Sequence, residues 1–353
     1  MITRRIKTLA KYTRATLEAS VRRVPGARRL VHAWRTRRDS SYLDRARRRA
    51  LLARKKPLPA PSPEDLQRAE QARDMMRALP AEERPNAAPA EQKWRLFKNE
   101  LRTSMLTQDL RDFLSWDVIS HNMGYGASTK DLRTLQNRHD WDRWHKAMIE
   151  SPKLNRWPFF ALPEVSENSV RQASHLHTFL EASGARLDDF DRIIDFGGGY
   201  GAMCRLVFRL GFRGQYVIID WPEFSILETY YLGASGLDMP ITRANEPVHT
   251  GIVLVNTIKE LNAVRSAFPT KRECLIATWS ISETPVSFRD TFFQAIEPQA
   301  FFIVYQKSFG GIDNEEYFSR LMKRRSDVKW SRIRASYLPS EGNYYLIGMR
   351  PLT

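Results

Sequence analysis

The stretch Ile193-Ile-Asp-Phe-Gly-Gly-Gly-Tyr-Gly201 decides the fold of this chain. It joins a short apolar run, which is typical of a buried strand, to a turn rich in glycine. After the turn, apolar residues follow the i, i+3, i+4, i+7 spacing of a helix at Met203, Leu206, Val207 and Leu210. A second apolar run, Tyr216–Ile219, then ends at Asp220. A strand, a glycine turn, a helix and a second strand closed by a carboxylate predict the nucleotide-binding half of a doubly wound α/β domain.

Downstream, predicted strands and helices alternate, and the chain ends with two strands joined by a turn. The further strands are expected at residues 252–255, 274–278, 301–305, 330–334 and 344–349. Five alternating β/α units closed by a hairpin-like pair match the seven-stranded, Rossmann-like sheet of class I methyltransferases, whereas dehydrogenase sheets normally lack the reversed last strand. The predicted fold class is therefore α/β with this sheet, preceded by a helical N-terminal region.

The glycine turn is compatible with two cofactors. Gly197-x-Gly199-x-x-Ala202 satisfies the dinucleotide pattern, which is a weak signal alone. Asp195, however, stands two residues before the first glycine, where a carboxylate would face the negative pyrophosphate of a dinucleotide. The ammonium and sulfonium groups of S-adenosylmethionine are cations that a carboxylate suits. The residues therefore favour S-adenosylmethionine, and an NAD-type oxidoreductase is the alternative.

The candidate cofactor-binding residues follow the carboxyl ends of successive predicted strands. Asp220 is placed for hydrogen bonds to the ribose hydroxyls, Trp221 could cover the adenine, and Asn256 could reach the edge of the adenine. The full predicted set is Asp195, Gly197, Gly198, Gly199, Gly201, Asp220, Trp221, Asn256 and Ser280.

The loop Trp279–Pro285, after the fourth strand, faces the methyl group in this architecture. Methyl transfer to a hydroxyl needs a base that removes the proton of that hydroxyl. Glu283 is the first candidate for this base, although it could instead cap the helix after Pro285. His175 is the second candidate, because it lies off the apolar face of the helix predicted from Val165 to Ser183 and is expected to face a pocket or solvent.

Several stretches of this sequence resemble the bacterial sugar O-methyltransferase family of class I enzymes. They are Asp195–Gly201, Ile219-Asp-Trp-Pro-Glu223, Tyr230-Tyr-Leu232, Trp279-Ser-Ile-Ser-Glu-Thr-Pro285 and Asn343-Tyr-Tyr-Leu-Ile347. The resemblance spans residues 165–353, and more loosely the aromatic region from residue 92. It implies a class I methyltransferase fold, S-adenosylmethionine as cofactor and a sugar hydroxyl as acceptor, in the assembly of a glycan or lipopolysaccharide.

The 353 residues divide by composition into three regions. Residues 1–62 form a basic tail and proline-rich linker, 63–184 a helical, aromatic-rich cap or substrate region, and 185–353 the cofactor-binding domain. Ser62 suits a helix N-cap, with Pro63 at the first helical position. The aromatic residues of the middle region are expected to form core, and the alternative is that some line a sugar pocket.

The basic excess belongs to the N-terminal tail. Residues 1–60 contain 19 of the 56 Lys and Arg residues but only three of the 40 Asp and Glu residues. The remainder of the chain therefore has 37 basic and 37 acidic residues. A nucleic-acid enzyme would carry a basic face on its catalytic domain, so a nucleic-acid partner is not expected. Residues 1–56 could bind an anionic membrane surface, which would place a cytoplasmic enzyme at the inner membrane face. The alternatives are a solvated tail, an organelle transit peptide, or the docking segment of a non-catalytic adaptor.

The sequence predicts neither a disulfide framework nor a metal site. Cys204 and Cys274 are the two cysteines of the chain. His139 and His145 lie six residues apart, which does not align them on one helical face.

Overall fold

The computed structural model describes residues 58–80, 89–120, 123, 128–155, 158–159, 162–335 and 342–351. All described elements belong to the compact unit Pro57–Thr353. The predictions made for residues 1–56 lie outside the described residues. Among the residues that are described, no helix is long and apolar enough to cross a membrane.

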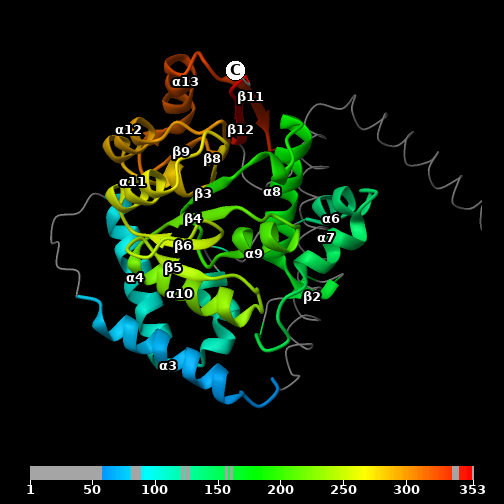
Figure 1. The fold of residues 1–353 in the computed structure, drawn as a ribbon, viewed down its shortest axis with the longest axis vertical. Helices are drawn as coiled ribbons and strands as arrows, with labels where there is room; N and C mark the ends of the chain where they lie inside the picture. Colours follow the sequence, from blue (N-terminus) through cyan, green and yellow to red (C-terminus); the bar gives the residue numbers. More distant parts are fainter. Residues whose placement is uncertain are drawn as a thin grey trace, which may run out of the picture. The chain divides into compact units, whose positions relative to one another are not determined.

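The described residues form one large sheet of eight strands in the order β11-β12-β8-β7-β3-β4-β6-β5 (Figure 1). Its strands are β3 (Arg192–Phe196), β4 (Gln215–Ile219), β5 (Ile241–Arg243), β6 (Gly251–Val255), β7 (Glu273–Thr278), β8 (Ala300–Gln306), β11 (Lys329–Arg334) and β12 (Asn343–Met349). The six strands from β5 to β8 run parallel, and β12 runs antiparallel to both of its neighbours, β8 and β11. The doubly wound α/β class and the reversed strand are confirmed.

The predicted count of seven strands is wrong, because β5 adds an eighth at the β6 edge of the sheet. This strand is three residues long and half-buried, and it contains no continuous apolar run. Its sequence therefore carries no periodic signal of a strand, and pairing with β6 determines its conformation.

Two hydrophobic cores cover the two faces of the sheet. Because side chains alternate along a strand, Ile193 packs into one core and Ile194 into the other. The helices of the first face are α8 (Glu167–Ser183), α9 (Ala202–Arg209) and α10 (Pro222–Ala234). The helices of the second face are α11 (Ile258–Ala267), α12 (Val286–Ala295) and α13 (Asn314–Arg324).

The N-terminal helices join the core of the first face. They are α3 (Pro63–Ala78), α4 (Pro89–Thr107), η1 (Leu110–Ser115), α5 (Asp117–Ile119), α6 (Thr129–Gln136) and α7 (Trp141–Met148). The predicted cap of α3 is confirmed, since Ser62 and Asp65 form a reciprocal capping box. Phe97 of α4 stacks on Phe224 of α10 with ring centroids 5.4 Å apart, as expected for aromatic side chains that serve as core.

The remaining helices and strands of the described residues are short. They are β1 (Pro158–Phe159), β2 (Leu162–Ser166), η3 (Leu187–Asp189), η4 (Ser280–Glu283), β9 (Ser308–Phe309) and β10 (Ile312–Asp313). Of these, η4 matters most for the site, because it is the loop that follows β7 at the carboxyl edge of the sheet.

Candidate cofactor and active site

The glycine turn lies directly after β3, at the carboxyl edge of the sheet. Gly197, Gly199 and Gly201 have φ values of +70°, +66° and +92°, a region that glycine adopts without the strain that a side chain brings. The amide of Gly197 donates to the carbonyl oxygen of Ile219 at 2.9 Å, which fixes the turn to the end of β4. The positive φ angles therefore explain why glycine occupies three of the four predicted positions.

Gly197 also permits a close approach of the η4 loop. A Cβ at this position would lie 2.3 Å from the Cβ of Ser280. The Ser280 hydroxyl donates to the carbonyl oxygen of Phe196, so it joins the loop after β7 to the end of β3. The predicted contact of Ser280 with a cofactor stays a prediction.

We expect Gly197→Ala to destabilise the protein more than Gly184→Ala does. Both glycines have φ near +70°, so alanine costs about 1–2 kcal/mol of backbone strain at either position. Nothing lies within 4 Å of a Cβ at Gly184, whereas at Gly197 the clash with Ser280 adds about 1–3 kcal/mol. Urea denaturation of the two variants measures the difference. Equal losses would show that the contact between Gly197 and Ser280 does not constrain the folded state.

Asp220 lies beside the glycine turn, as the sequence predicts. Its Oδ2 accepts from the backbone amide of Gly199 at 3.0 Å, and its Oδ1 accepts from the amide of Trp221 at 2.7 Å. Burial raises the pKa of Asp220 to about 7 against the opposing effect of these two bonds, and Asp195 and Glu223 raise it further. Asp220 as a whole residue is half-buried.

Asp195 lies beneath the turn rather than on its outer surface. It is 2% exposed, and its Oδ2 accepts a hydrogen bond from the hydroxyl of Tyr216 at 2.8 Å. Burial raises the pKa of Asp195 to about 7, although the Tyr216 bond opposes this. Its predicted contact with the ammonium group of a cofactor stays a prediction.

Glu228 of α10 is a second buried carboxyl group under the turn, and the sequence reasoning missed it. A Cβ at Gly198 would lie 3.2 Å from Glu228 Oε1 and 3.3 Å from Asp195 Oδ2, so both carboxyl groups lie below this glycine. Neither oxygen of Glu228 has a hydrogen-bond partner among the described residues. Burial, and then the charges of Asp220 and Asp195, raise the pKa of Glu228 well above its usual range. Its position four residues after the core residue Phe224 is the signal that could have revealed its burial.

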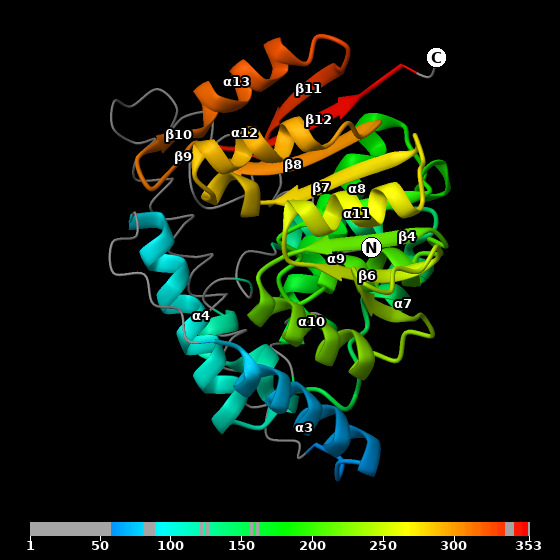
Figure 2. The ribbon, with the colours of Figure 1, turned by 60° about the vertical axis from the view of Figure 1, so that its left-hand side comes forward.

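Helix α4 reaches the carboxyl edge of the sheet beside Trp221 (Figure 2). The Nζ of Lys98 lies 4.1 Å from the centroid of the Trp221 ring, and the Trp94 ring meets Trp221 edge-on at 5.8 Å. The side chain predicted to cover an adenine is thus itself held by two residues of α4. No local pattern in the sequence indicates this contact.

Asn256 links three elements at the same edge. Its Nδ2 donates to the carbonyl oxygen of Asp220 and to the hydroxyl of Ser225, both at 2.8 Å. Both amide hydrogens are therefore used within the chain. The predicted contact of Asn256 with the edge of an adenine stays a prediction. Oδ1 is the atom of the side chain that would make this contact.

Met123 lies against the outer side of the glycine turn. A Cβ at Gly199 would lie 3.1 Å from Met123 Sδ. A cavity of about 10 Å³, which fits a single water molecule, lies between Met123 and Tyr200. A ligand that contacts the turn on this side would have to displace the Met123 side chain.

The first candidate base, Glu283, is half-buried in η4. Its Oε1 accepts a hydrogen bond from Gln306 Nε2 at 3.2 Å. Gln306 is the last residue of β8, so Glu283 is held over the carboxyl ends of β7 and β8. This placement agrees with a group that faces an acceptor, and the role of base stays a prediction.

The expected position of His175, facing a pocket or solvent, is wrong. The side chain is 0% exposed, and its Nδ1 lies 2.9 Å from the hydroxyl of Tyr345. Helix α8 packs on α6, α9 and β12 at once, so residues off its apolar stripe are buried as well. Burial and the charge of Arg171 lower the pKa of His175 to about 3, and the imidazole is therefore neutral at neutral pH. Its Nε2 has no hydrogen-bond partner among the described residues.

No protein-family model matches the sequence. No curated protein matches it either. Solved structures that match include magnesium protoporphyrin IX methyltransferase ChlM from Synechocystis PCC 6803 with bound SAM. It is 13% identical, with 64% of this chain and 100% of that chain covered and a TM-score of 0.37.

Mitomycin 7-O-methyltransferase MmcR is 12% identical over 76% of this chain and 74% of that chain, with a TM-score of 0.34. A fibrillarin/Nop5p complex matches at 12% identity over 50% of this chain and 80% of that chain, with a TM-score of 0.33. With identities of 12–13% and TM-scores below 0.5, these matches establish neither the fold nor the function of this chain. The resemblance to sugar O-methyltransferases therefore stays a hypothesis.

Proposed function

We propose that this chain is an S-adenosylmethionine-dependent O-methyltransferase that acts on a hydroxyl group of a sugar or glycan. The observation that carries the cofactor assignment is the hydrogen bond from the Gly199 amide to Asp220 Oδ2. It brings the glycine turn and the acidic end of the second strand together at the carboxyl edge, where open α/β sheets bind nucleotides.

Two features favour a methyl donor over a dinucleotide. The first is β12, the reversed strand between β8 and β11. The second is the group of three carboxyl groups at the turn, Asp195, Asp220 and Glu228, because repulsion between their charged forms contributes to the raised pKa of Asp220 and of Glu228. A cation beside them would relieve this repulsion, and a pyrophosphate would increase it.

The residues present fit the cofactor. Asp220 would bind the ribose hydroxyls, Trp221 would cover the adenine, and Gly197–Gly201 would let the ligand lie against the backbone. S-adenosylmethionine supplies an electrophilic methyl group when it is bound. Glu283 would accept the proton of the acceptor hydroxyl as that oxygen attacks.

We expect isothermal titration calorimetry with S-adenosylhomocysteine to show saturable binding that Asp220→Ala weakens at least tenfold. The variant loses a carboxylate that can bind two hydroxyl groups, and each hydrogen bond to a charged group contributes about 1.5–3 kcal/mol. Asp238→Ala is the matched control, because Asp238 is exposed in the loop after α10. Absence of binding to the wild-type protein would refute the cofactor assignment, and saturable binding of NADH would favour the dinucleotide alternative.

The acceptor is tested by mass spectrometry of glycans from cells with and without the gene. We expect one methyl group to be lost with the gene and restored by the wild-type chain. Glu283→Gln should lower the methylation rate by about 10²–10⁴, because a glutamine cannot remove the hydroxyl proton. Glu246→Gln, an exchange of an exposed glutamate, should restore methylation fully. Unchanged glycans, with cofactor binding intact, would refute the acceptor and leave the methyltransferase assignment standing.

A further inference from the structure

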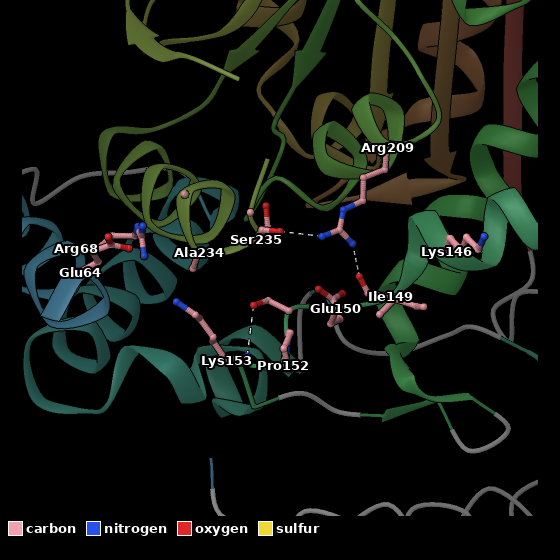
Figure 3. Close-up of a pocket in the computed structure, with 13 residues that line it drawn as sticks. Glu64, Arg68, Lys146, Ile149, Glu150, Pro152, Lys153, Arg209, Ala234 and Ser235 are labelled. Atoms are coloured by element: carbon pink, nitrogen blue, oxygen red, sulfur yellow. Dashed lines mark hydrogen bonds between the residues drawn. The ribbon is translucent and has the colours of Figure 1, made fainter. Parts of the chain in front are cut away.

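A cavity of about 520 Å³ lies outside the candidate cofactor site, since none of the predicted cofactor-binding residues lines it. Its walls come from the end of α9, at Arg209, from the end of α10, from the first turns of α3, and from residues 146–153 (Figure 3). Helices α9 and α10 begin at the carboxyl edge of the sheet and run back to the amino edge, because the strands that follow them are parallel. None of the glycine-turn residues 197–201 lines this cavity, which lies at the carboxyl-terminal end of α10.

Cationic side chains outnumber acidic ones in the lining of this cavity. Figure 3 shows Arg209 and Lys153 approaching it from different sides. The cationic lining residues are Arg68, Lys146, Lys153 and Arg209, and the acidic ones are Glu64 and Glu150.

Glu150 does not balance these charges. Its Oε1 lies 3.1 Å from Arg205, and both side chains are 0% exposed. The same carboxylate accepts hydrogen bonds from the hydroxyls of Ser166, Ser169 and Tyr231. Glu150 is therefore already neutralised by Arg205 within the protein.

Arg209 carries a charge that no carboxylate pairs with in the described part of the chain. Its guanidinium donates to the carbonyl oxygens of Ile149 and Ser235, the latter at 2.8 Å. Burial, and then the charge of Arg205, lower the pKa of Arg209. A half-buried guanidinium held only by neutral carbonyl groups would be stabilised by an anion in the cavity.

Arg68 and Lys153 share one carboxylate. Asp65 lies 3.3 Å from Arg68 and 3.0 Å from Lys153. Burial works to raise the pKa of Asp65, but the hydrogen bonds from Ser62 and Lys153 prevail and hold it at about 2. Gly233 lets Arg68 lie on the end of α10, since a Cβ there would be 3.0 Å from Arg68 Nε. With Glu64, this wall carries two carboxylates for its two cations, so the net positive charge of the cavity comes from Lys146 and Arg209.

We propose that this cavity binds the phosphate group of a phosphorylated ligand. Guanidinium and ammonium groups are the side chains that bind phosphate best, and a volume of about 520 Å³ lies within the range of small-molecule sites. The phosphate could belong to a soluble metabolite or to a lipid headgroup. Helix α3, which forms one wall, follows the Arg-rich segment 1–56 after the short linker 57–62, so both sources need a test.

The test compares three full-length variants with the wild-type chain. Lys153→Glu reverses a charge on the cavity wall, Lys153→Gln removes it with less disturbance, and Lys323→Glu reverses an exposed charge on α13 as the control. Each variant is first checked for an unchanged melting temperature. Calorimetry with glycerol phosphate probes the soluble source, and sedimentation with phosphatidylcholine vesicles, with and without phosphatidic acid, probes the lipid source.

We expect Lys153→Glu to weaken phosphate binding at least tenfold, Lys153→Gln to weaken it less, and Lys323→Glu to leave it unchanged. A loss confined to glycerol phosphate would identify a soluble ligand. A loss confined to vesicles with phosphatidic acid would identify a lipid headgroup. If no probe binds saturably, or if Lys153→Glu and Lys323→Glu behave alike, the cavity is not a phosphate site.

Discussion

Glu150→Gln is expected to lower the free energy of unfolding by about 3–5 kcal/mol, because it leaves the Arg205 guanidinium buried without a counter-charge. The pair is 0% exposed, and water cannot solvate the remaining cation. Glu150 also accepts hydrogen bonds from the hydroxyls of Ser169 and Tyr231. Glu150→Gln therefore weakens the contact of residue 150 with both α8 and α10.

Urea denaturation measures this loss, and a double variant separates charge from packing. Replacing Glu150 by Leu and Arg205 by Met together removes both charges, and should cost clearly less than Glu150→Gln alone. Glu297→Gln is the control, because Glu297 is 70% exposed in its pair with Arg325 and should cost less than about 1 kcal/mol. A loss of similar size for Glu150→Gln and Glu297→Gln would contradict the buried ion pair.

Asp195→Asn is expected to stabilise the protein at pH 8 by up to about 4 kcal/mol. The folded protein raises the pKa of Asp195 from 3.8 to about 7, and each unit corresponds to about 1.4 kcal/mol. Between these two pH values the folded state binds more protons than the unfolded state, so this group lowers stability as the pH rises. The penalty is absent below about pH 4 and complete above about pH 7. The amide of Asn can still accept the hydrogen bond from Tyr216.

The measurement is the difference in unfolding free energy between Asp195→Asn and wild type from pH 4 to pH 8. The difference should grow up to about pH 7 and then stay constant. His175 acts in the opposite direction, because its lowered pKa removes stability as the pH falls below about 6.5, but it is present in both proteins and cancels. Asp238→Asn, at an exposed site, should show no such pH dependence. Parallel curves for Asp195→Asn and wild type would show that Asp195 titrates normally.

Local patterns in the sequence predicted the sheet and the edge of the site. Strand β3 contains the apolar residues Ile193, Ile194 and Phe196. The turn after it needs glycine at positive φ, and Asp220 follows the next strand directly. Each of these signals lies within a few residues of the feature that it predicts.

Contacts between distant segments were not predictable in this way. His175 is buried because three elements pack around α8, and Lys98 meets Trp221 across more than 100 residues of chain. Glu228 was missed because a glutamate in a helix usually faces water. Strand β5 was missed because its pairing with β6, rather than its composition, makes it a strand.

The hydrogen bonds of Asn256 and Ser280 have a consequence for the entropy of ligand binding. Asn256 joins the end of β4 to the first turn of α10, and Ser280 joins the loop after β7 to β3, through hydrogen bonds within the chain. These bonds hold the backbone of the carboxyl edge in place, so a nucleotide-like ligand would lose little affinity to the ordering of the backbone. The remaining entropy loss on binding would come from the ordering of side chains such as Met123.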